Sequence, residues 1–269
     1  MPRKKTNNKE FVVYPVKPAD HNTDLKKTWN ENLPDVSTGA LLTIVAKIKS
    51  GKSSLISNLF FREEAYRDVF KSSFFISDTI DGDDTMRYVK DHYEDTCYST
   101  YDDSLIKKIW KYQMDQPRPR PSYSLVLDDC IGSIKMGSTV NSFCAKFRHI
   151  TDTASLVIIS SQKMTSISPI IRNNTTNWLL SNCKNQKKER ERIAEELSGS
   201  FGGEETFYKL WDYACAEPYN WFYLVMTSNP PKAFKNFNEQ IYPSAQFKDD
   251  GDDSNEEYVE DEEEVSASE

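Results

Sequence analysis

The chain has 269 residues, of which 38% are hydrophobic and 28% are charged, and its formal net charge is −8. No apolar run approaches the roughly 20 residues that a membrane span needs, and no apolar segment follows the basic start Met1–Lys5, so we expect neither a membrane span nor a secretory signal. The five cysteines are odd in number and include no Cys-x-x-Cys pair, which favours a reducing compartment over a disulfide framework or a zinc site.

Charge is unevenly distributed along the chain. Residues 249–269 hold 12 of the 42 acidic residues and none of the 34 basic ones, so residues 1–248 carry 30 acidic and 34 basic residues, a formal +4. We expect a mildly basic body that permits nucleic-acid binding, and a disordered acidic tail over residues 246–269. For this tail, a segment that mimics DNA or binds a partner and a segment that only aids solubility both stay open.

Residues 1–37 are predicted to form an N-terminal arm and a segment that wraps the next domain. The first ten residues are basic and polar, which is typical of a solvated terminus. Phe11–Tyr14 has the composition of an edge strand and is followed by prolines. The main domain is expected over residues 38–245.

The strongest motif lies in residues 41–56. Leu41–Val45 is apolar or β-branched and predicts a strand, which enters a turn containing Gly51-Lys52-Ser53 and then an apolar helix pattern to about residue 61. A phosphate-binding loop needs this context, because its backbone N–H groups and the helix N-terminus cradle an anion. The residues expected to contact a nucleotide are Ala46, Lys47, Ile48, Lys49, Ser50, Gly51, Lys52, Ser53 and Ser54.

Three positions in this loop have specific consequences. Lys52 is placed to reach the outer phosphates, and the Ser53 hydroxyl is placed to ligate Mg²⁺. Ala46 stands where the usual pattern opens with glycine, so the loop is expected to work only if Ala46 keeps a negative φ.

Strands and helices are predicted to alternate after the loop. Residues 72–77 read as a buried strand, and helical patterns follow near residues 84–93 and 102–115. Between them, the acidic segment 78–84 leaves open a metal site or a solvated turn with a helix cap, and we favour the second. Pro117–Pro121 cannot be helical and is expected to be a stiff connector, although its two arginines could contact nucleic acid or a neighbouring subunit.

A second strong signal is the strand Ser124–Leu127, which ends in Asp128-Asp129. Phosphoryl transfer needs one carboxylate to hold Mg²⁺ and a second group to orient or deprotonate water. Asp128 suits the first role and Asp129 the second. The alternative is an Asp-Asp turn that caps the next helix.

Two further candidates follow a predicted helix over residues 138–148. Gln162 ends a buried strand at 154–162, where its amide can touch the γ-phosphate or the attacking water if this strand lies beside the carboxylate strand; otherwise it bonds local backbone. Arg172 lies before the next strand, Trp178–Leu180, and fits either an arginine supplied to a neighbour's nucleotide or a surface salt bridge.

The C-terminal part of the domain is expected to add two helices and one strand. Residues 185–197 read as a charged helix and residues 204–215 as an amphipathic one. Residues 219–226 are predicted to be the last strand, ended by Pro230-Pro231.

Taken in order, the motifs are the phosphate loop, the Asp-Asp strand, Arg148-His149, the strand ending in Gln162, and Arg172-x-Asn174. Over residues 38–228 this order resembles the genome-packaging ATPases of large DNA viruses, of the poxvirus type, in the FtsK–HerA superfamily. The resemblance implies an α/β fold built on a RecA-like P-loop NTPase sheet of ASCE-type strand order with flanking helices. In that order the Gln162 strand lies between the phosphate-loop strand and the Asp-Asp strand.

The resemblance also implies a function. It implies an ATP hydrolase with ATP and Mg²⁺ as cofactors, which drives double-stranded DNA into a preformed capsid. It further implies self-association into a ring of six subunits, a capsid or portal-vertex partner, and a location in the host cytoplasm, a virus factory or the virion. The implied roles are phosphate binding by Lys52, Mg²⁺ ligation by Ser53 and Asp128, water positioning by Asp129, γ-phosphate sensing by Gln162 and an in-trans finger at Arg172. Because no nuclease-like acidic cluster follows residue 180, we expect a motor without a DNA-cutting domain.

Two other classes of function stay open. A nucleotide kinase would need an arginine-rich lid, for which Arg118 and Arg120 are the candidates, but the Gln-tipped strand after the Asp-Asp strand favours the motor class. A nucleotide-binding assembly protein that does not hydrolyse ATP is the other, and Ala46 is its best argument. Comparing hydrolysis by the wild type and by Lys52→Ala distinguishes the second class from an ATPase.

Overall fold

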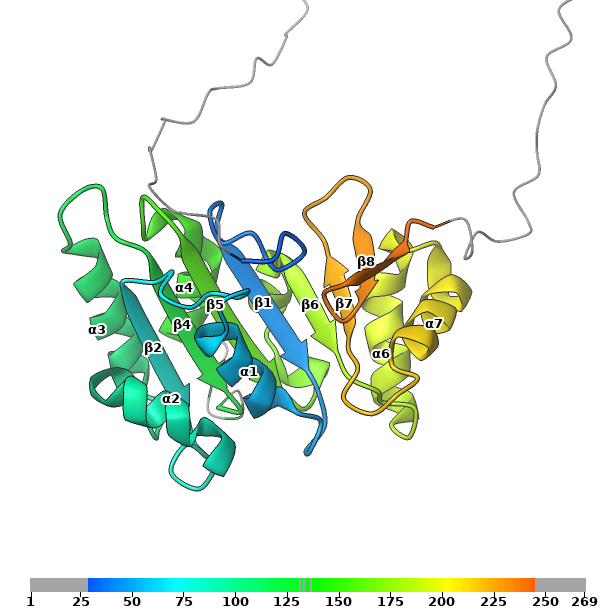
Figure 1. The fold of residues 1–269 in the computed structure, drawn as a ribbon, viewed down its shortest axis with the longest axis horizontal. Coiled ribbons are helices and arrows are strands. Elements are labelled where there is room, and N and C mark those ends of the chain that lie inside the picture. Colours follow the sequence, from blue (N-terminus) through cyan, green and yellow to red (C-terminus); the bar gives the residue numbers. More distant parts are fainter. Residues whose placement is uncertain (1–28, 131, 133, 136, 245–269) are drawn as a thin grey trace, which may run out of the picture.

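Nine strands form one sheet in the computed structural model, which describes residues 29–130, 132, 134, 135 and 137–244 (Figure 1). The strands are β1 Ala40–Val45, β2 Ser72–Ser77, β3 Cys97–Tyr98, β4 Tyr123–Asp128, β5 Ser155–Ser161, β6 Asn177–Leu180, β7 Phe222–Val225, β8 Lys232–Lys235 and β9 Glu239–Tyr242. Their order is β3-β2-β4-β5-β1-β6-β7-β8-β9. The first six of these are parallel, and β7, β8 and β9 are antiparallel additions.

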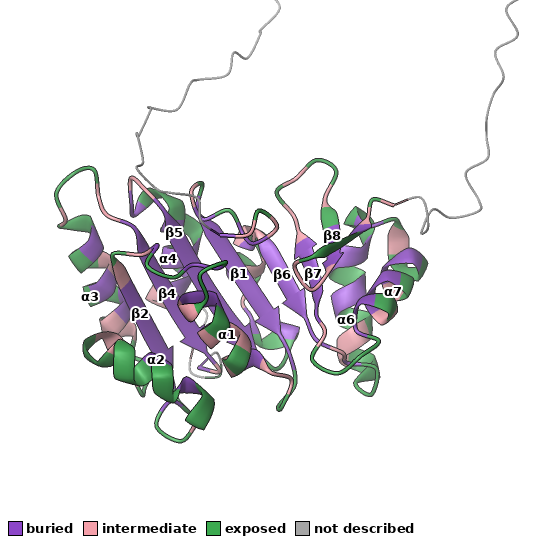
Figure 2. Ribbon diagram, in the orientation of Figure 1, coloured by how far each residue is buried: buried purple, intermediate pink, exposed green. Residues whose placement is uncertain are grey.

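The central order β2-β4-β5-β1-β6 confirms the expected RecA-like α/β fold. β5, which ends one residue before Gln162, lies between β1 and β4. Every residue of β1, β4 and β5 is buried, because parallel strands are covered on both faces (Figure 2). These strands read as apolar runs in the sequence for the same reason.

Helices cover both faces of this sheet (Figure 1). α1 Lys52–Phe61 and α2 Arg87–His92 pack on one face. The other face carries α3 Asp103–Met114, α4 Thr139–Lys146, α5 Pro169–Asn174, α6 Lys187–Leu197 and α7 Gly203–Ala214. Short 3₁₀ turns are η1 Asp84–Met86, η2 Glu94–Thr96, η4 Phe147–His149, η5 Met164–Ser166 and η6 Ser198–Ser200. No helix in the described ranges is long and apolar enough to cross a bilayer.

The described part of the N-terminal segment packs against the α1 face of the sheet. The rings of Trp29 and Tyr66 lie with centroids 6.0 Å apart, and the Tyr66 hydroxyl donates to the Pro34 carbonyl at 2.7 Å. Val36 is fully buried. The predicted basic arm, the Phe11–Tyr14 strand and the acidic tail lie outside the described residues.

The C-terminal part of the sheet differs from expectation. Residues 219–226 were predicted to be the last strand, but β8 and β9 follow Pro230-Pro231 and extend the sheet. β8 pairs antiparallel with β7, and its residues Ala233 and Phe234 are buried in the cores on opposite faces of the sheet. The prolines therefore end β7 and lie in the turn to the next strand. β7 itself begins only at Phe222, so Tyr219 and Asn220 belong to the preceding loop.

An aromatic cluster holds α1 on the sheet. Phe75 of β2 is fully buried, and its ring centroid lies 4.9 Å from that of Phe60 on α1 and 4.8 Å from that of Tyr93. We expect Phe75→Ala to lower the free energy of unfolding by about 3–5 kcal/mol, because it leaves a cavity between helix and strand. Urea denaturation measures this, with Tyr88→Ala, at a side chain 75% exposed, as the control. A loss under about 1 kcal/mol for Phe75→Ala would contradict the expectation.

Candidate functional site

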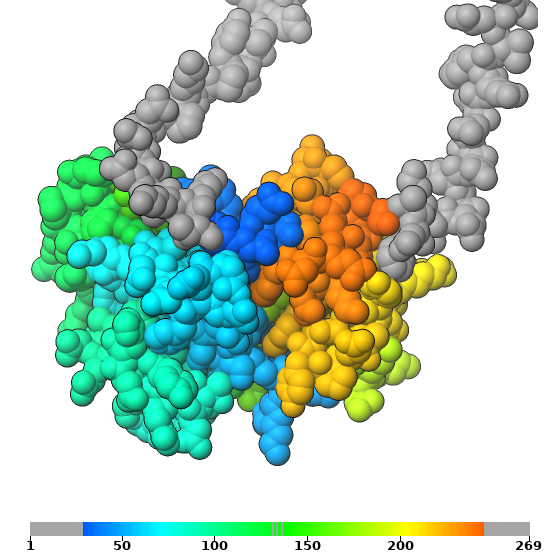
Figure 3. Space-filling view, viewed as in Figure 1, coloured from blue at the N-terminus to red at the C-terminus, as the bar shows by residue number. Residues whose placement is uncertain are grey.

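The loop from Ala46 to Gly51 joins β1 to α1 at the edge where the parallel strands end. It projects as the light-blue segment at the lower edge of Figure 3. Parallel sheets bind ligands at this edge. Lys49 has a φ of 62° and Gly51 a φ of 92°, and left-handed residues of this kind build the backbone nests that bind anions. The N-terminus of α1 follows directly, with its unpaired N–H groups.

The predicted condition on Ala46 is met. Its φ is negative, and its N–H donates to the Ser161 carbonyl at 2.9 Å. Because Ser161 ends β5, this bond ties the start of the loop to the neighbouring strand and places Gln162 beside it. The Gln162 residue is exposed.

Lys52 and Asp129, which are 77 residues apart in the sequence, meet in this site. The Nζ of Lys52 lies 2.5 Å from Oδ1 of Asp129, and the two side chains are 7% and 24% exposed. Such a largely buried ion pair is less screened than one on the surface. The loop lysine and the second carboxylate of the Asp-Asp strand therefore converge on one point.

A serine on β5 fixes both residues of the Asp-Asp pair. The Ser160 hydroxyl donates to Oδ1 of Asp128, and its Oγ accepts from the N–H of Asp129 at 3.1 Å. The register explains this, since Leu127 of β4 lies opposite Ile159 of β5 and the next residues follow in step. Asp129 has a φ of 52°, a left-handed conformation in which aspartate is enriched. Strained residues of this kind cluster at functional sites.

The electrostatic surroundings of Asp128 favour a cation. Burial raises the pKa of its carboxyl above the ordinary value, and the charges of Asp129 and Asp83 act in the same direction. The hydrogen bond from Ser160 and the charge of Lys52 oppose this rise. A buried carboxylate near other carboxylates gains from a divalent ion, so Asp128 fits the role of a metal ligand.

Asp83 brings a third carboxylate to the site. The turn that carries it is fixed to α1 by a hydrogen bond from Ser57 Oγ to the Thr85 carbonyl at 3.1 Å. The Asp83 carboxylate accepts from the Thr85 N–H at 2.8 Å, and it lies near the Ser53 hydroxyl. Burial acts to raise the pKa of Asp83, but these hydrogen bonds outweigh it and lower that pKa. The predicted helix cap is therefore present, and the contact with Ser53 comes in addition.

Arg172 lies in a salt bridge within its own subunit. On α5, its Nε lies 2.8 Å from Oε1 of Glu196 on α6, and its Nη1 donates to the Ile167 carbonyl at 2.8 Å. This contact corresponds to one of the two alternatives that the sequence left open. Asn174, at the end of the same helix, donates to the Ile170 carbonyl at 2.8 Å.

The remaining arginines named in the sequence lie at the opposite edge of the sheet. Arg148 packs over Gly39, just before β1 begins, where an added Cβ would lie 2.6 Å from its Cγ. Arg118 and Arg120 flank Asp152, with nitrogen–oxygen distances of 3.8 Å, in the segments before β4 and β5. The phosphate loop, in contrast, follows the end of β1.

Comparison with known proteins supports this fold. No protein-family model and no curated protein sequence matches the chain. Among solved structures, the DNA-packaging ATPase B204 from Sulfolobus turreted icosahedral virus aligns with a TM-score of 0.53 and 17% identity, over 74% of this chain and 98% of that chain. The genome-packaging NTPase B204 from Sulfolobus turreted icosahedral virus 2, in complex with AMPPCP, aligns with a TM-score of 0.53 and 16% identity, over 73% and 97%.

The chain shares the fold of the B204 packaging NTPases. The complex of B204 from virus 2 with ATP-gammaS gives a TM-score of 0.52 over 74% of this chain and 98% of that chain. Nearly the whole length of B204 is thus covered. The shared packaging-NTPase fold is the one that the sequence motifs implied.

Three residues of this site were not predicted. The sequence contains a feature that could have indicated Ser160, because two serines end an otherwise apolar strand. Asp83 lay in an acidic segment that was interpreted as a turn. Tyr219 had no signal, because it was placed inside the last strand; its ring lies 3.3 Å from the position that a Cβ on Gly51 would take.

Proposed function

We propose that this protein is an ATP hydrolase that moves double-stranded DNA and packages a viral genome. The observation that carries the proposal is the contact of Lys52 with Asp129 at the strand ends, beside Asp128 and across β5. The likeness to packaging NTPases supports the choice of a DNA motor among P-loop enzymes. We assign the ATPase domain to residues 38–245, preceded by the N-terminal arm and followed by the acidic tail.

The residues present suit a triphosphate with Mg²⁺. Ser50 Oγ is buried in the loop without a hydrogen-bond partner in the described part of the chain, and a phosphate oxygen would satisfy it. No group of three His, Cys, Asp or Glu side chains in the described residues forms a metal site of its own. Mg²⁺ needs no such cage, because it keeps waters and phosphate oxygens as ligands. Ser53 and Asp128 are the residues that would hold it.

The chemistry follows from the ion pair. A triphosphate in the loop attracts Lys52 away from Asp129, which frees the Asp129 carboxylate to orient and deprotonate a water molecule. Bound Mg²⁺ supplies charge neutralisation at the phosphate oxygens. We assign to Gln162, which is exposed beside the start of the loop, the role of responding to the terminal phosphate.

We propose that assembly into a ring couples ATP hydrolysis to the movement of DNA. In a ring, a neighbour completes each site, and we propose Arg172 as the residue supplied in trans. Arg172 would have to leave Glu196 to do so, so subunit rotation and the breaking of this salt bridge would be linked. Capsid or portal-vertex protein is the proposed partner, and the host cytoplasm, the virus factory or the virion the proposed location.

The test combines turnover with mass. Phosphate release by the full chain is measured with and without double-stranded DNA, while light scattering gives the mass in solution. We expect DNA to stimulate turnover and the mass to be a multiple of 31.1 kDa. Stimulation should fall steeply with salt, because contacts to backbone phosphates release counterions. A monomer whose turnover ignores DNA and needs a small acceptor would overturn the proposal.

The arginines that a nucleotide kinase would need for its lid do not lie near the phosphate loop. Arg118 and Arg120 flank Asp152 in the segments before β4 and β5, whereas the phosphate loop lies after β1 at the other edge. The argument for a protein that does not hydrolyse ATP was that Ala46 could distort the loop. Ala46 has the negative φ that the loop requires, so this argument no longer applies.

Asp83 yields a prediction about the metal. If Ser53 ligates Mg²⁺, its hydroxyl proton can donate to the nearby Asp83 carboxylate, which orients the oxygen toward the ion. We expect Asp83→Asn to weaken metal affinity in the presence of AMPPCP on the order of tenfold, measured by Mn²⁺ titration with electron paramagnetic resonance. Asparagine keeps the helix cap.

Asp84→Asn is the matched control for this prediction. Asp84 is the next residue, is exposed, and pairs with Arg87 at 2.5 Å. Its replacement should leave Mn²⁺ affinity unchanged. Equal effects of the two substitutions would show that general surface charge, and not the contact with Ser53, is responsible.

A further inference from the structure

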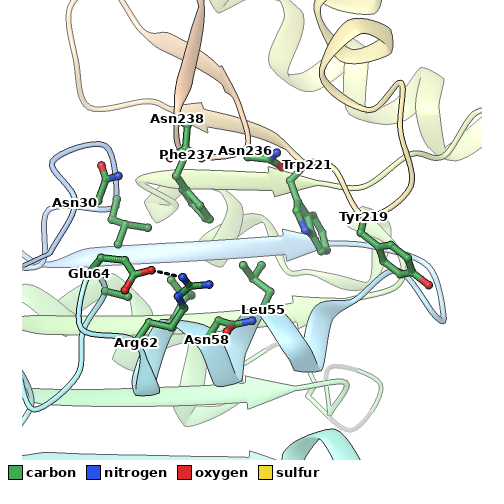
Figure 4. A pocket seen from close by; sticks show the side chains of 13 residues that line it. Asn30, Leu55, Asn58, Arg62, Glu64, Tyr219, Trp221, Asn236, Phe237 and Asn238 are labelled. Atoms are coloured by element: carbon green, nitrogen blue, oxygen red, sulfur yellow. Dashed lines mark hydrogen bonds and ion pairs between the residues drawn. The ribbon is translucent and has the colours of Figure 1, made fainter.

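A groove of about 480 Å³ runs along the outer side of α1 (Figure 4). α1 forms one wall, and Trp221 with the turn between β8 and β9 forms the other. Tyr219 stands at the end next to the phosphate loop, and the Arg62–Glu64 ion pair lies at the far end. The groove therefore begins where a nucleotide bound in the loop would leave it.

Tyr219 is held in an unusual position. Its side chain is 71% exposed, yet its φ is 65°, a left-handed conformation that is strained for a tyrosine. The ring packs on the backbone of Gly51, where an added Cβ would lie only 3.3 Å away. An exposed aromatic ring that gains little burial, held in a strained backbone against a phosphate loop, suits contact with a ligand.

The groove begins one residue after the first turn of the phosphate loop's helix. The first turn of α1, at Ser53 and Ser54, is where an α-phosphate would accept backbone hydrogen bonds. The next residue, Leu55, is the first residue of α1 that lines the groove. A ribose would therefore carry its base from the helix N-terminus directly into the space between Leu55 and Tyr219.

The lining has the chemistry of a base site. Leu55, Leu59 and Trp221 supply apolar walls beside the Tyr219 ring. Asn58 contributes an amide whose Nδ2 donates to the Ser54 carbonyl at 2.8 Å, so its Oδ1 can accept from an exocyclic amine. A flat heterocycle with polar edges fits apolar walls with a few amides.

A second hollow on the other side of Tyr219 has a different character. It measures about 440 Å³ and is lined by Lys47, Lys49 and Lys184. Lysines at this density suit an anion better than an uncharged base. Both hollows are lined by asparagines, but the one along α1 has no lysine in its lining and has the larger apolar side chains Leu55, Leu59 and Trp221.

We propose that the end of this groove between Leu55, Asn58 and Tyr219 binds the adenine base of ATP, with the base stacked on the Tyr219 ring. This inference rests on the proposed ATP site in the loop. In this proposal, two parts of the protein recognise ATP separately. The loop holds the triphosphate, and Tyr219 selects for a ligand that carries a base. A ligand without a base makes no use of Tyr219.

Calorimetry with two probes tests this division. The full chain is titrated with AMPPCP and with inorganic tripolyphosphate, each with Mg²⁺. Tyr219→Ala should weaken AMPPCP binding on the order of ten- to a hundredfold, the usual effect of losing one stacked base, and change tripolyphosphate affinity less than about twofold. Tyr219→Phe keeps the ring and should stay within about threefold of the wild type for both probes.

Two bulky substitutions distinguish the two hollows. Asn58 and Asn185 are both exposed, and each lines one hollow only. Asn58→Trp should fill the groove and weaken AMPPCP but not tripolyphosphate, whereas Asn185→Trp should leave AMPPCP affinity unchanged. The reverse result would overturn the proposal by moving the base to the lysine-lined hollow.

The outcomes also separate this inference from the proposed function. If the wild type binds AMPPCP and tripolyphosphate equally tightly, or if Tyr219→Ala weakens both alike, the base subsite is overturned and the phosphate site stands. If the wild type binds neither probe, the ATP site fails and the base subsite fails with it.

Discussion

Lys52→Ala is expected to lower the rate of ATP hydrolysis on the order of 100- to 1,000-fold, the usual loss when one preorganised group that stabilises transition-state charge is removed. Lys52 is the residue that can carry positive charge from Asp129 to the terminal phosphates, and it is held 7% exposed at the first position of α1. Phosphate release at saturating ATP measures the effect. Dissociation constants for AMPPCP should rise as well, because the lysine binds phosphate in the ground state too.

Lys71→Ala is the matched control. Lys71 is exposed just before β2 begins, at the sheet edge opposite the phosphate loop. It should hydrolyse ATP at the wild-type rate. We expect Lys52→Ala to fold, because Asp129 loses its partner but is 24% exposed and stays hydrated. Circular dichroism checks this expectation. Equal phosphate release by Lys52→Ala and the wild type would reject the catalytic assignment.

The sequence predicted the parts of the site that depend on local chemistry. The apolar run before Gly51-Lys52-Ser53 had to form a buried strand, and the residues after it a helix, so the loop between them followed. The Asp-Asp pair was found in the same way, from an apolar run with a polar end. The position of β5 between β1 and β4 came instead from the order of motifs, because strand order depends on packing between distant segments.

The parts that were not predicted depend on contacts between segments far apart in the chain. In the sequence, Asp83 cannot be told from any other acidic turn residue. Only the docking of η1 on α1, through Ser57 and Thr85, brings its carboxylate near Ser53. Ser160 becomes important only through its register with Asp128. Neither contact leaves a periodic pattern in the sequence.

The C-terminal strands were missed for a different reason. Pro230-Pro231 is a sound signal for the end of a strand, but it gives no information about whether another strand follows. β8 and β9 have four residues each and are stabilised by pairing with β7 and with each other. Their turn forms one wall of the groove beside Tyr219, so this error also hid the proposed base subsite.

Asp129→Asn is expected to separate binding of ATP from its hydrolysis. Asparagine cannot deprotonate water, so the rate of phosphate release should fall on the order of 100- to 10,000-fold, the range expected for loss of a general base. ATP should bind at least as tightly as to the wild type, because the triphosphate no longer has to displace a carboxylate 2.5 Å from the Lys52 ammonium. Single-turnover hydrolysis and AMPPCP calorimetry measure the two effects independently.

This opposite response of affinity and rate is what distinguishes Asp129 from a structural residue. A substitution that merely disturbed the Ser160 hydrogen bonds would weaken both binding and turnover, and Asp115→Asn, exposed at the end of α3, should alter neither. Lys52→Ala is expected to lower both affinity and rate, so the two variants together would assign phosphate binding to the lysine and water activation to the carboxylate. Weaker AMPPCP binding by Asp129→Asn would mean that the Lys52–Asp129 pair supports the phosphate loop and does not compete with the nucleotide.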